Sequence, residues 1–318
     1  MNISVTDPIR PAWNHMVRIL FKPFAFKKWL ALGFCAFLAQ CSAQGGSNSS
    51  QVSAQPGGYE RGFEAAKTWI YANFDLFITL SVSGIFLLIL IGLFITWISS
   101  RGKFMLLDGI VKNRGAVREP WTNYKTQGNS LFLFTVALSA VLLFCFLLIG
   151  GISALIALPD IQSQTLTGLG VTSIVVGGTL LFFYILFCIS LSFFMSVFMV
   201  PTMYLKKMRA VEAWETAWNE LCKGHFGSSI LLFLMMLVLG IASGTVSMFA
   251  VCATCCIAAL PYVSSVVLLP ITVFFACYAL CYIQQFGSEW IFFKNYCHFC
   301  NYELQGLEEG HICPECGK

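Results

Sequence analysis

The feature that most constrains this chain is a long stretch without a single ionisable side chain. Between Ser228 and Ser288 the chain contains no Asp, Glu, Lys, Arg or His. A run of about 18 apolar residues is enough to mark a membrane span, and several runs here are longer. Soluble domains average about 25% charged residues, whereas this chain has 11%. We therefore predict an all-α integral membrane protein.

Six apolar runs predict about six transmembrane helices, arranged as three hairpins in a membrane domain that covers residues 1–290. Pro261 and Pro270 predict kinks in the last span, because proline interrupts the helical hydrogen-bond ladder. The six spans are expected at residues 29–43, 76–98, 131–158, 171–200, 228–250 and 257–286.

The basic residues predict the orientation of the spans. All but two of the 19 Lys and Arg residues lie before the first span, after the last, or in loops on the same side; the exceptions are Arg61 and Lys67. Basic residues accumulate on the cytoplasmic side of membrane proteins. Both termini are therefore expected in the cytoplasm, and the protein in the cytoplasmic (inner) membrane.

The first span is short and leaves alternatives open. A cleaved signal peptide would use a poor small-residue site around Cys41–Ala43. A lipoprotein site at Cys41 would place Gln40 where a small residue is expected. Crossing is favoured, because otherwise five basic residues would lie on the outer side.

Short amphipathic segments precede the odd-numbered spans, at residues 8–22, 104–125 and 204–223. The second is interrupted at Gly115 and Pro120. We predict three units, each an interfacial helix followed by a two-span hairpin. Basic helices that carry Trp lie at the headgroup level and favour anionic lipid, although they can also simply cover the ends of a bundle.

One stretch carries a family resemblance. The sequence from Leu20 to Phe24, followed by that from Lys28 to Ala39, resembles the opening of a family of uncharacterised bacterial and archaeal polytopic proteins. That family is similar to the glycerophosphodiester-phosphodiesterase membrane-domain superfamily. The resemblance implies a prokaryotic helical membrane domain with paired spans. It implies no catalytic residue, because the hydrolase activity of that superfamily belongs to a separate soluble domain.

The C-terminal residues 294–318 contain two CxxC pairs, formed by Cys297, Cys300, Cys313 and Cys316. Four thiolates at this spacing predict a closed tetrahedral site for structural Zn²⁺, in a zinc ribbon on the cytoplasmic side. Iron is the alternative metal for these four thiolates. Two disulfides are disfavoured in a reducing compartment.

A second cysteine group lies at the outer end of the fifth span, at Cys252, Cys255 and Cys256. It could form a disulfide, a redox site or simple packing contacts. In the same span Gly240 and Gly244 form a GxxxG pattern, which predicts close helix packing but leaves the oligomeric state open.

Reactive groups are missing from the predicted spans. Spans two to six contain no ionisable residue, and no nucleotide-binding or hydrolase motif occurs in the sequence. We therefore expect a non-enzymatic protein. Nucleic acid is an unlikely partner, because acidic residues outnumber basic ones around the ribbon.

Two functions remain. The first is a membrane scaffold or adaptor whose zinc ribbon recruits a soluble cytoplasmic protein. The second is a lipid-handling or small-molecule transport protein with a cleft that opens laterally between spans. In the second case the important residues are expected to be Trp121, Trp214, Arg114 and Arg209.

Overall fold

The computed structural model describes residues 3–44, 67–68, 71–163, 168–253 and 261–293. Every regular element in these ranges is a helix. Five of the helices that the structure describes are long and apolar enough to cross a bilayer. They cover Phe74–Val111, Lys125–Ile156, Gly170–Lys206, Phe226–Phe249 and Leu269–Phe286. The predicted all-α class is therefore confirmed for the described residues, with five candidate spans where six were predicted.

The first helix, α1 (Ile9–Phe21), corresponds to the first predicted amphipathic segment. It packs along α12 (Leu269–Ile283) and buries Met16, Ile19 and Leu20. Trp13 belongs to the same amphipathic segment, but it remains 56% exposed. The buried face is therefore narrower than the apolar face of the sequence.

The first predicted span forms α2 (Phe26–Gln44), which packs closely along α4 (Phe74–Val111). It is not among the five candidate spans. Glycines of α4 allow the close approach. A Cβ atom at Gly102 would lie 2.6 Å from the backbone nitrogen of Ala39, and one at Gly109 would lie 2.5 Å from Cδ2 of Leu32.

Helix α4 corrects the prediction for the second amphipathic segment. The helix does not end near residue 98 but continues to Val111, because nothing in this stretch breaks it. The chain leaves the helix only at Asn113, which has a positive φ of 50°. The short helix α5 (Arg118–Asn123) follows. Residues 104–111 are thus the end of a membrane-spanning helix, not a separate interfacial one.

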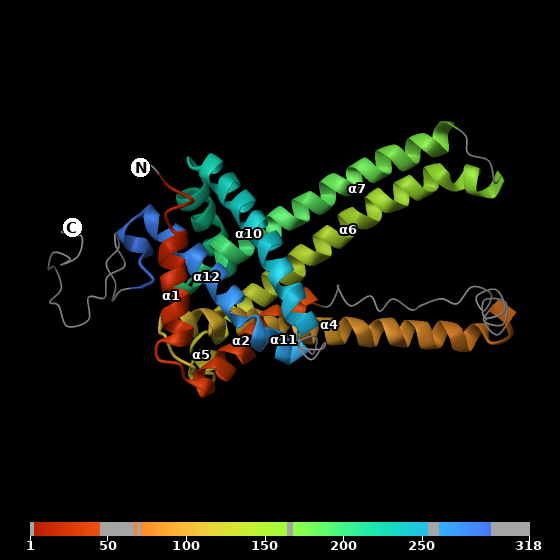
Figure 1. Cartoon of the computed structure of the whole chain (residues 1–318). Helices are drawn as coiled ribbons and strands as arrows, with labels where there is room; N and C mark the ends of the chain where they lie inside the picture. Colours follow the sequence, from red (N-terminus) through yellow and green to blue (C-terminus); the bar gives the residue numbers. More distant parts are fainter. Residues whose placement is uncertain (1–2, 45–66, 69–70, 164–167, 254–260, 294–318) are drawn as a thin grey trace.

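Helices α6 (Lys125–Ser163) and α7 (Gly168–Phe194) form the predicted second hairpin, which projects from the rest of the molecule (Figure 1). The Tyr184 hydroxyl donates a hydrogen bond to the Leu142 carbonyl at 2.8 Å. The chain continues through the π-helical turn η1 (Met195–Met199) into α8 (Val200–Lys206).

The third predicted amphipathic segment is divided into two parts. Lys207 has a positive φ of 53° and separates α8 from α9 (Ala210–Thr216), which continues into the π-helical turn η2 (Ala217–Cys222). Small residues such as Ala213 face the protein, whereas Val211 is 68% exposed. The apolar side chains of this segment are therefore only partly buried.

The last elements are α10 (Phe226–Ala253), α11 (Pro261–Val267) and α12, followed by the 3₁₀ turns η4 (Gln284–Phe286) and η5 (Ser288–Trp290). The break between α11 and α12 at Leu268 confirms the kink predicted at Pro270. Helix α11 packs on α2, and α12 packs on α1.

The glycines of α10 make no contact of the kind that GxxxG predicts. A Cβ atom at Gly240 or Gly244 would have no heavy atom within 4 Å in the described structure. In the described residues, close packing uses other glycines instead, including Gly33 of α2, Gly102 and Gly109 of α4, and Gly177 of α7.

Candidate functional site

A buried carboxylate organises the end of α4. Asp108 is fully buried, with an exposed fraction of 0%. Its Oδ1 atom lies 2.7 Å from the Lys112 ammonium, one helical turn further along α4, and its Oδ2 atom lies 2.9 Å from the Arg114 guanidinium. A buried carboxylate needs such partners, because an unpaired buried charge is strongly destabilising.

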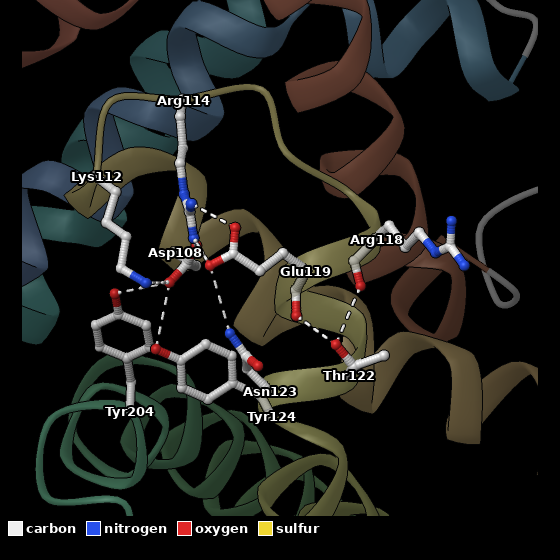
Figure 2. Close-up of polar contacts among 9 residues, drawn as sticks. All are labelled: Asp108, Lys112, Arg114, Arg118, Glu119, Thr122, Asn123, Tyr124 and Tyr204. Atoms are coloured by element: carbon white, nitrogen blue, oxygen red, sulfur yellow. Dashed lines mark hydrogen bonds and ion pairs between the residues drawn. The ribbon is translucent and has the colours of Figure 1, made fainter.

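Two tyrosine hydroxyls complete the shell around Asp108 (Figure 2). Tyr124 and Tyr204 each donate a hydrogen bond to Oδ1, at 3.3 Å and 3.2 Å. Their rings stack with centroids 5.1 Å apart. Tyr124 follows α5 and Tyr204 belongs to α8, so one carboxylate joins three separate parts of the chain.

Arg114 extends this network to α5. Its two terminal nitrogens bind the two oxygens of Glu119 at 2.6 Å and 2.9 Å. The hydrogen bonds to Glu119 and Asp108 raise the pKa of Arg114. The hydrogen bond from Arg114 lowers the pKa of Glu119, and burial raises the pKa of Tyr124. The two parallel hydrogen bonds between Arg114 and Glu119 are the bidentate, stronger form of an arginine–carboxylate pair.

The Asp108 cluster has the chemistry of a structural site, not of a reactive one. Two cationic and two anionic side chains balance, and four donors already occupy the Asp108 oxygens. A carboxylate with this many partners is held as an anion and has little capacity to act as a general base. The cluster therefore fixes the loop after α4 against α5 and α8.

Another cationic side chain of α4, Arg101, lies between the ring of Trp97 in α4 and that of Trp121 in α5. Its guanidinium carbon is 4.4 Å from the ring centroid of Trp97 and 4.9 Å from that of Trp121. It also donates a hydrogen bond of 2.9 Å to Asn129 of α6. Cation–π contacts strengthen when they are removed from water, and Arg101 is only 6% exposed. This contact ties α4, α5 and α6 together.

The four residues predicted for lipid binding do not converge on one site. Arg114 belongs to the Asp108 cluster and Trp121 packs against Arg101. The Arg209 backbone N–H donates to Glu212 at the start of α9. Trp214 packs against Phe194 and lines a groove of about 490 Å³ between α7, α9 and α10.

A larger groove lies between α1, α10 and α12, with a volume of about 880 Å³. One of its walls is α1, with Thr6 and Arg10 at the start of the helix and Trp13 further along. The Trp13 ring meets Phe274 of α12 edge to face, with centroids 6.1 Å apart. The remaining wall is mostly apolar and includes Met16, Leu239, Ala242, Val246, Ile271 and Phe275.

Of the Asp108 cluster and the large groove, only the cluster could have been predicted from a pattern in the sequence. The i, i+4 spacing of Asp108 and Lys112 on a helix is a recognised pairing pattern and could have revealed the cluster. The large groove has no such signal, because its wall combines residues from three helices that are far apart in the sequence.

The predicted zinc ligands Cys297, Cys300, Cys313 and Cys316 lie outside the described residues. Cys255 and Cys256 lie outside them as well. Within the part of the chain that the structure describes, no group of three or more metal-binding side chains is found. The ribbon and its metal thus stay predictions.

Comparison with known proteins gives one match. A family described as a family of unknown function (DUF7544) matches residues 3–287. No curated protein and no solved structure matches the chain.

Proposed function

The chain belongs to the family of unknown function DUF7544, and we propose that it is a lipid-handling membrane protein that holds an acyl chain in the groove between α1, α10 and α12. The groove carries this proposal. Its volume of about 880 Å³ lies within the roughly 300–1,000 Å³ typical of ligand sites.

The chemistry of the wall favours an acyl chain. Side chains of the Trp, Met, Leu, Val, Ile and Phe types dominate the lining. An unfilled apolar groove loses dispersion contacts along its whole wall. Inside a bilayer, lipid chains are the apolar groups available to restore these contacts.

Filling the groove tests this proposal. Ala242 lines the groove, whereas the neighbouring Ile241 is 65% exposed and does not line it. The Ala242→Trp and Ile241→Trp variants would be purified in nanodiscs, and the phospholipid that stays bound per protein would be measured by native mass spectrometry.

We expect the wild type and Ile241→Trp to retain a bound lipid and Ala242→Trp to lose it. Equal lipid retention by all three proteins would remove the basis for the proposal.

The same proposal places the protein in the inner membrane of a prokaryote, with both termini in the cytoplasm and α2 as a sixth span. The distribution of Lys and Arg supports this orientation. The amphipathic character of α1, which carries Arg10 and Arg18, supports contact with anionic lipid. The orientation is tested by labelling an engineered cysteine in residues 45–66 with a membrane-impermeant maleimide, in a variant whose native cysteines outside residues 294–318 are replaced by Ser. Only an outward-facing cysteine reacts in intact cells.

A second candidate function is the adaptor, in which a zinc ribbon at residues 294–318 recruits a soluble protein. The segment before the ribbon supports it. The Phe293 ring stacks on His15 of α1 with centroids 4.0 Å apart, and the Gln285 amide donates to the Ser4 carbonyl at 2.8 Å. Cys297, the first predicted zinc ligand, follows Phe293 by only four residues. A ribbon there would start from a fixed point on the membrane domain.

The adaptor proposal is tested by comparing the wild type with a Cys297→Ser/Cys300→Ser variant. A soluble protein that copurifies with the wild type, and whose purified form binds the wild type but not the variant, supports it. Identical binding by both proteins contradicts it.

A further inference from the structure

We infer that the groove between α1, α10 and α12 selects a glycerophospholipid with an anionic headgroup, whose phosphate binds Arg10 at the start of α1. This inference rests on the proposed function and adds the identity of the ligand. The groove has a polar end at Thr6 and Arg10 and an apolar body that begins at Trp13. A phospholipid is arranged in the same way, with a polar headgroup at one end and apolar chains beyond it.

Arg10 is placed to receive the headgroup. It lines the groove, yet its side chain is exposed, so the guanidinium can reach an incoming phosphate. Guanidinium groups bind phosphate through two parallel N–H···O hydrogen bonds. The neighbouring Thr6 hydroxyl is able to donate a further one.

The electrostatics of this end of the groove favour an anion. No Asp or Glu is among the residues that line it, and the first turn of α1 contains no acidic residue. The N-terminal end of a helix carries a partial positive charge, which adds to that of Arg10. The nearest carboxylate in the sequence, Asp7, precedes the helix and is absent from the lining.

The positive charge of Arg10 favours binding of anionic over zwitterionic lipids. Both kinds carry a phosphate, but a zwitterionic headgroup brings its own cation close to Arg10. An anionic headgroup such as phosphatidylglycerol avoids that repulsion. A single basic residue near a membrane surface contributes about 1 kcal/mol, which corresponds to a preference of about fivefold.

The test measures which lipid is retained from nanodiscs that contain equal amounts of phosphatidylglycerol and phosphatidylcholine. The variant is Arg10→Gln, and the matched control is Lys22→Gln, which removes the same charge from the exposed end of α1 outside the groove. Arg10→Lys serves as the conservative variant.

We expect the wild type and Lys22→Gln to enrich phosphatidylglycerol about fivefold. Arg10→Gln should retain the same total amount of lipid at a ratio close to one, and Arg10→Lys should keep part of the preference. Inorganic phosphate should not displace the lipid. Displacement by phosphate would instead identify a site for the free anion and overturn the assignment.

The outcomes separate the two proposals. If Arg10→Gln keeps the wild-type lipid ratio, or if Lys22→Gln loses it to the same extent, the headgroup assignment fails while the groove still holds a chain. If the wild type retains no lipid that Ala242→Trp loses, the proposed function fails as well.

Discussion

Replacing Gly102 by Ala tests the packing that holds α2 against α4. The new Cβ atom would lie 2.6 Å from the backbone nitrogen of Ala39 and 2.7 Å from the backbone carbonyl carbon of Leu38. Backbone atoms cannot move away by a rotamer change, so α2 itself must shift. Overpacking of this kind costs roughly 1–3 kcal/mol, and we expect the upper half of that range.

A helix-propensity gain acts in the opposite direction and must be separated from this cost. Replacing Gly by Ala inside a helix stabilises it by up to about 1 kcal/mol. Gly92 lies on the same helix with no heavy atom within 4 Å of its built Cβ, so Gly92→Ala measures the gain alone. The difference between the two variants is therefore the steric cost, about 2–3 kcal/mol.

The assay is reversible unfolding in mixed micelles of dodecylmaltoside and SDS, followed by tryptophan fluorescence. Gly109→Ala should fall between the other two variants, because its Cβ would lie 2.5 Å from Cδ2 of Leu32, the end of a side chain, and a milder 3.1 Å from the Arg114 backbone oxygen. A Gly102→Ala protein within about 0.5 kcal/mol of Gly92→Ala, which is the range of ordinary surface substitutions, would refute the reasoning.

Three further predictions concern the Asp108 cluster and the ribbon. Asp108→Ala should lower the free energy of unfolding by about 3 kcal/mol, the low end for breaking a buried pair, because Arg114 keeps Glu119; an effect within the roughly 0.5 kcal/mol of ordinary surface substitutions would contradict this. The pKa of Glu119 is lowered in the folded state, so its stabilising contribution is present above the ordinary glutamate pKa and is lost as the pH falls through the lowered value. The melting temperature of the wild type should then fall more than that of Glu119→Gln over this acid range, and parallel curves would argue against the Arg114 pairing. The wild type should contain one zinc ion per chain by plasma mass spectrometry and Cys297→Ser/Cys300→Ser much less, whereas equal zinc in both would exclude the ribbon site.

The residues of the candidate site were only partly predictable. The sequence singled out Arg114 and Trp121, and both take part in side-chain contacts of the α4–α5 region. They were predicted as lipid-binding groups, but one pairs with Asp108 and the other with Arg101. The groove wall at Arg10, Trp13 and Phe274 could not be foreseen, because it depends on how α1 and α12 meet.

By itself, the sequence determined the helical membrane class, the α6–α7 hairpin and the break before Pro270. Each of these depends on local properties, namely apolar run length, loop position and the missing N–H of proline. Only the tertiary structure decided that α12 packs on α1, that α4 continues to Val111 and that Asp108 is buried. The physical reason is that lipid and protein interior are similarly apolar, so hydropathy does not show which face of a spanning helix meets another helix.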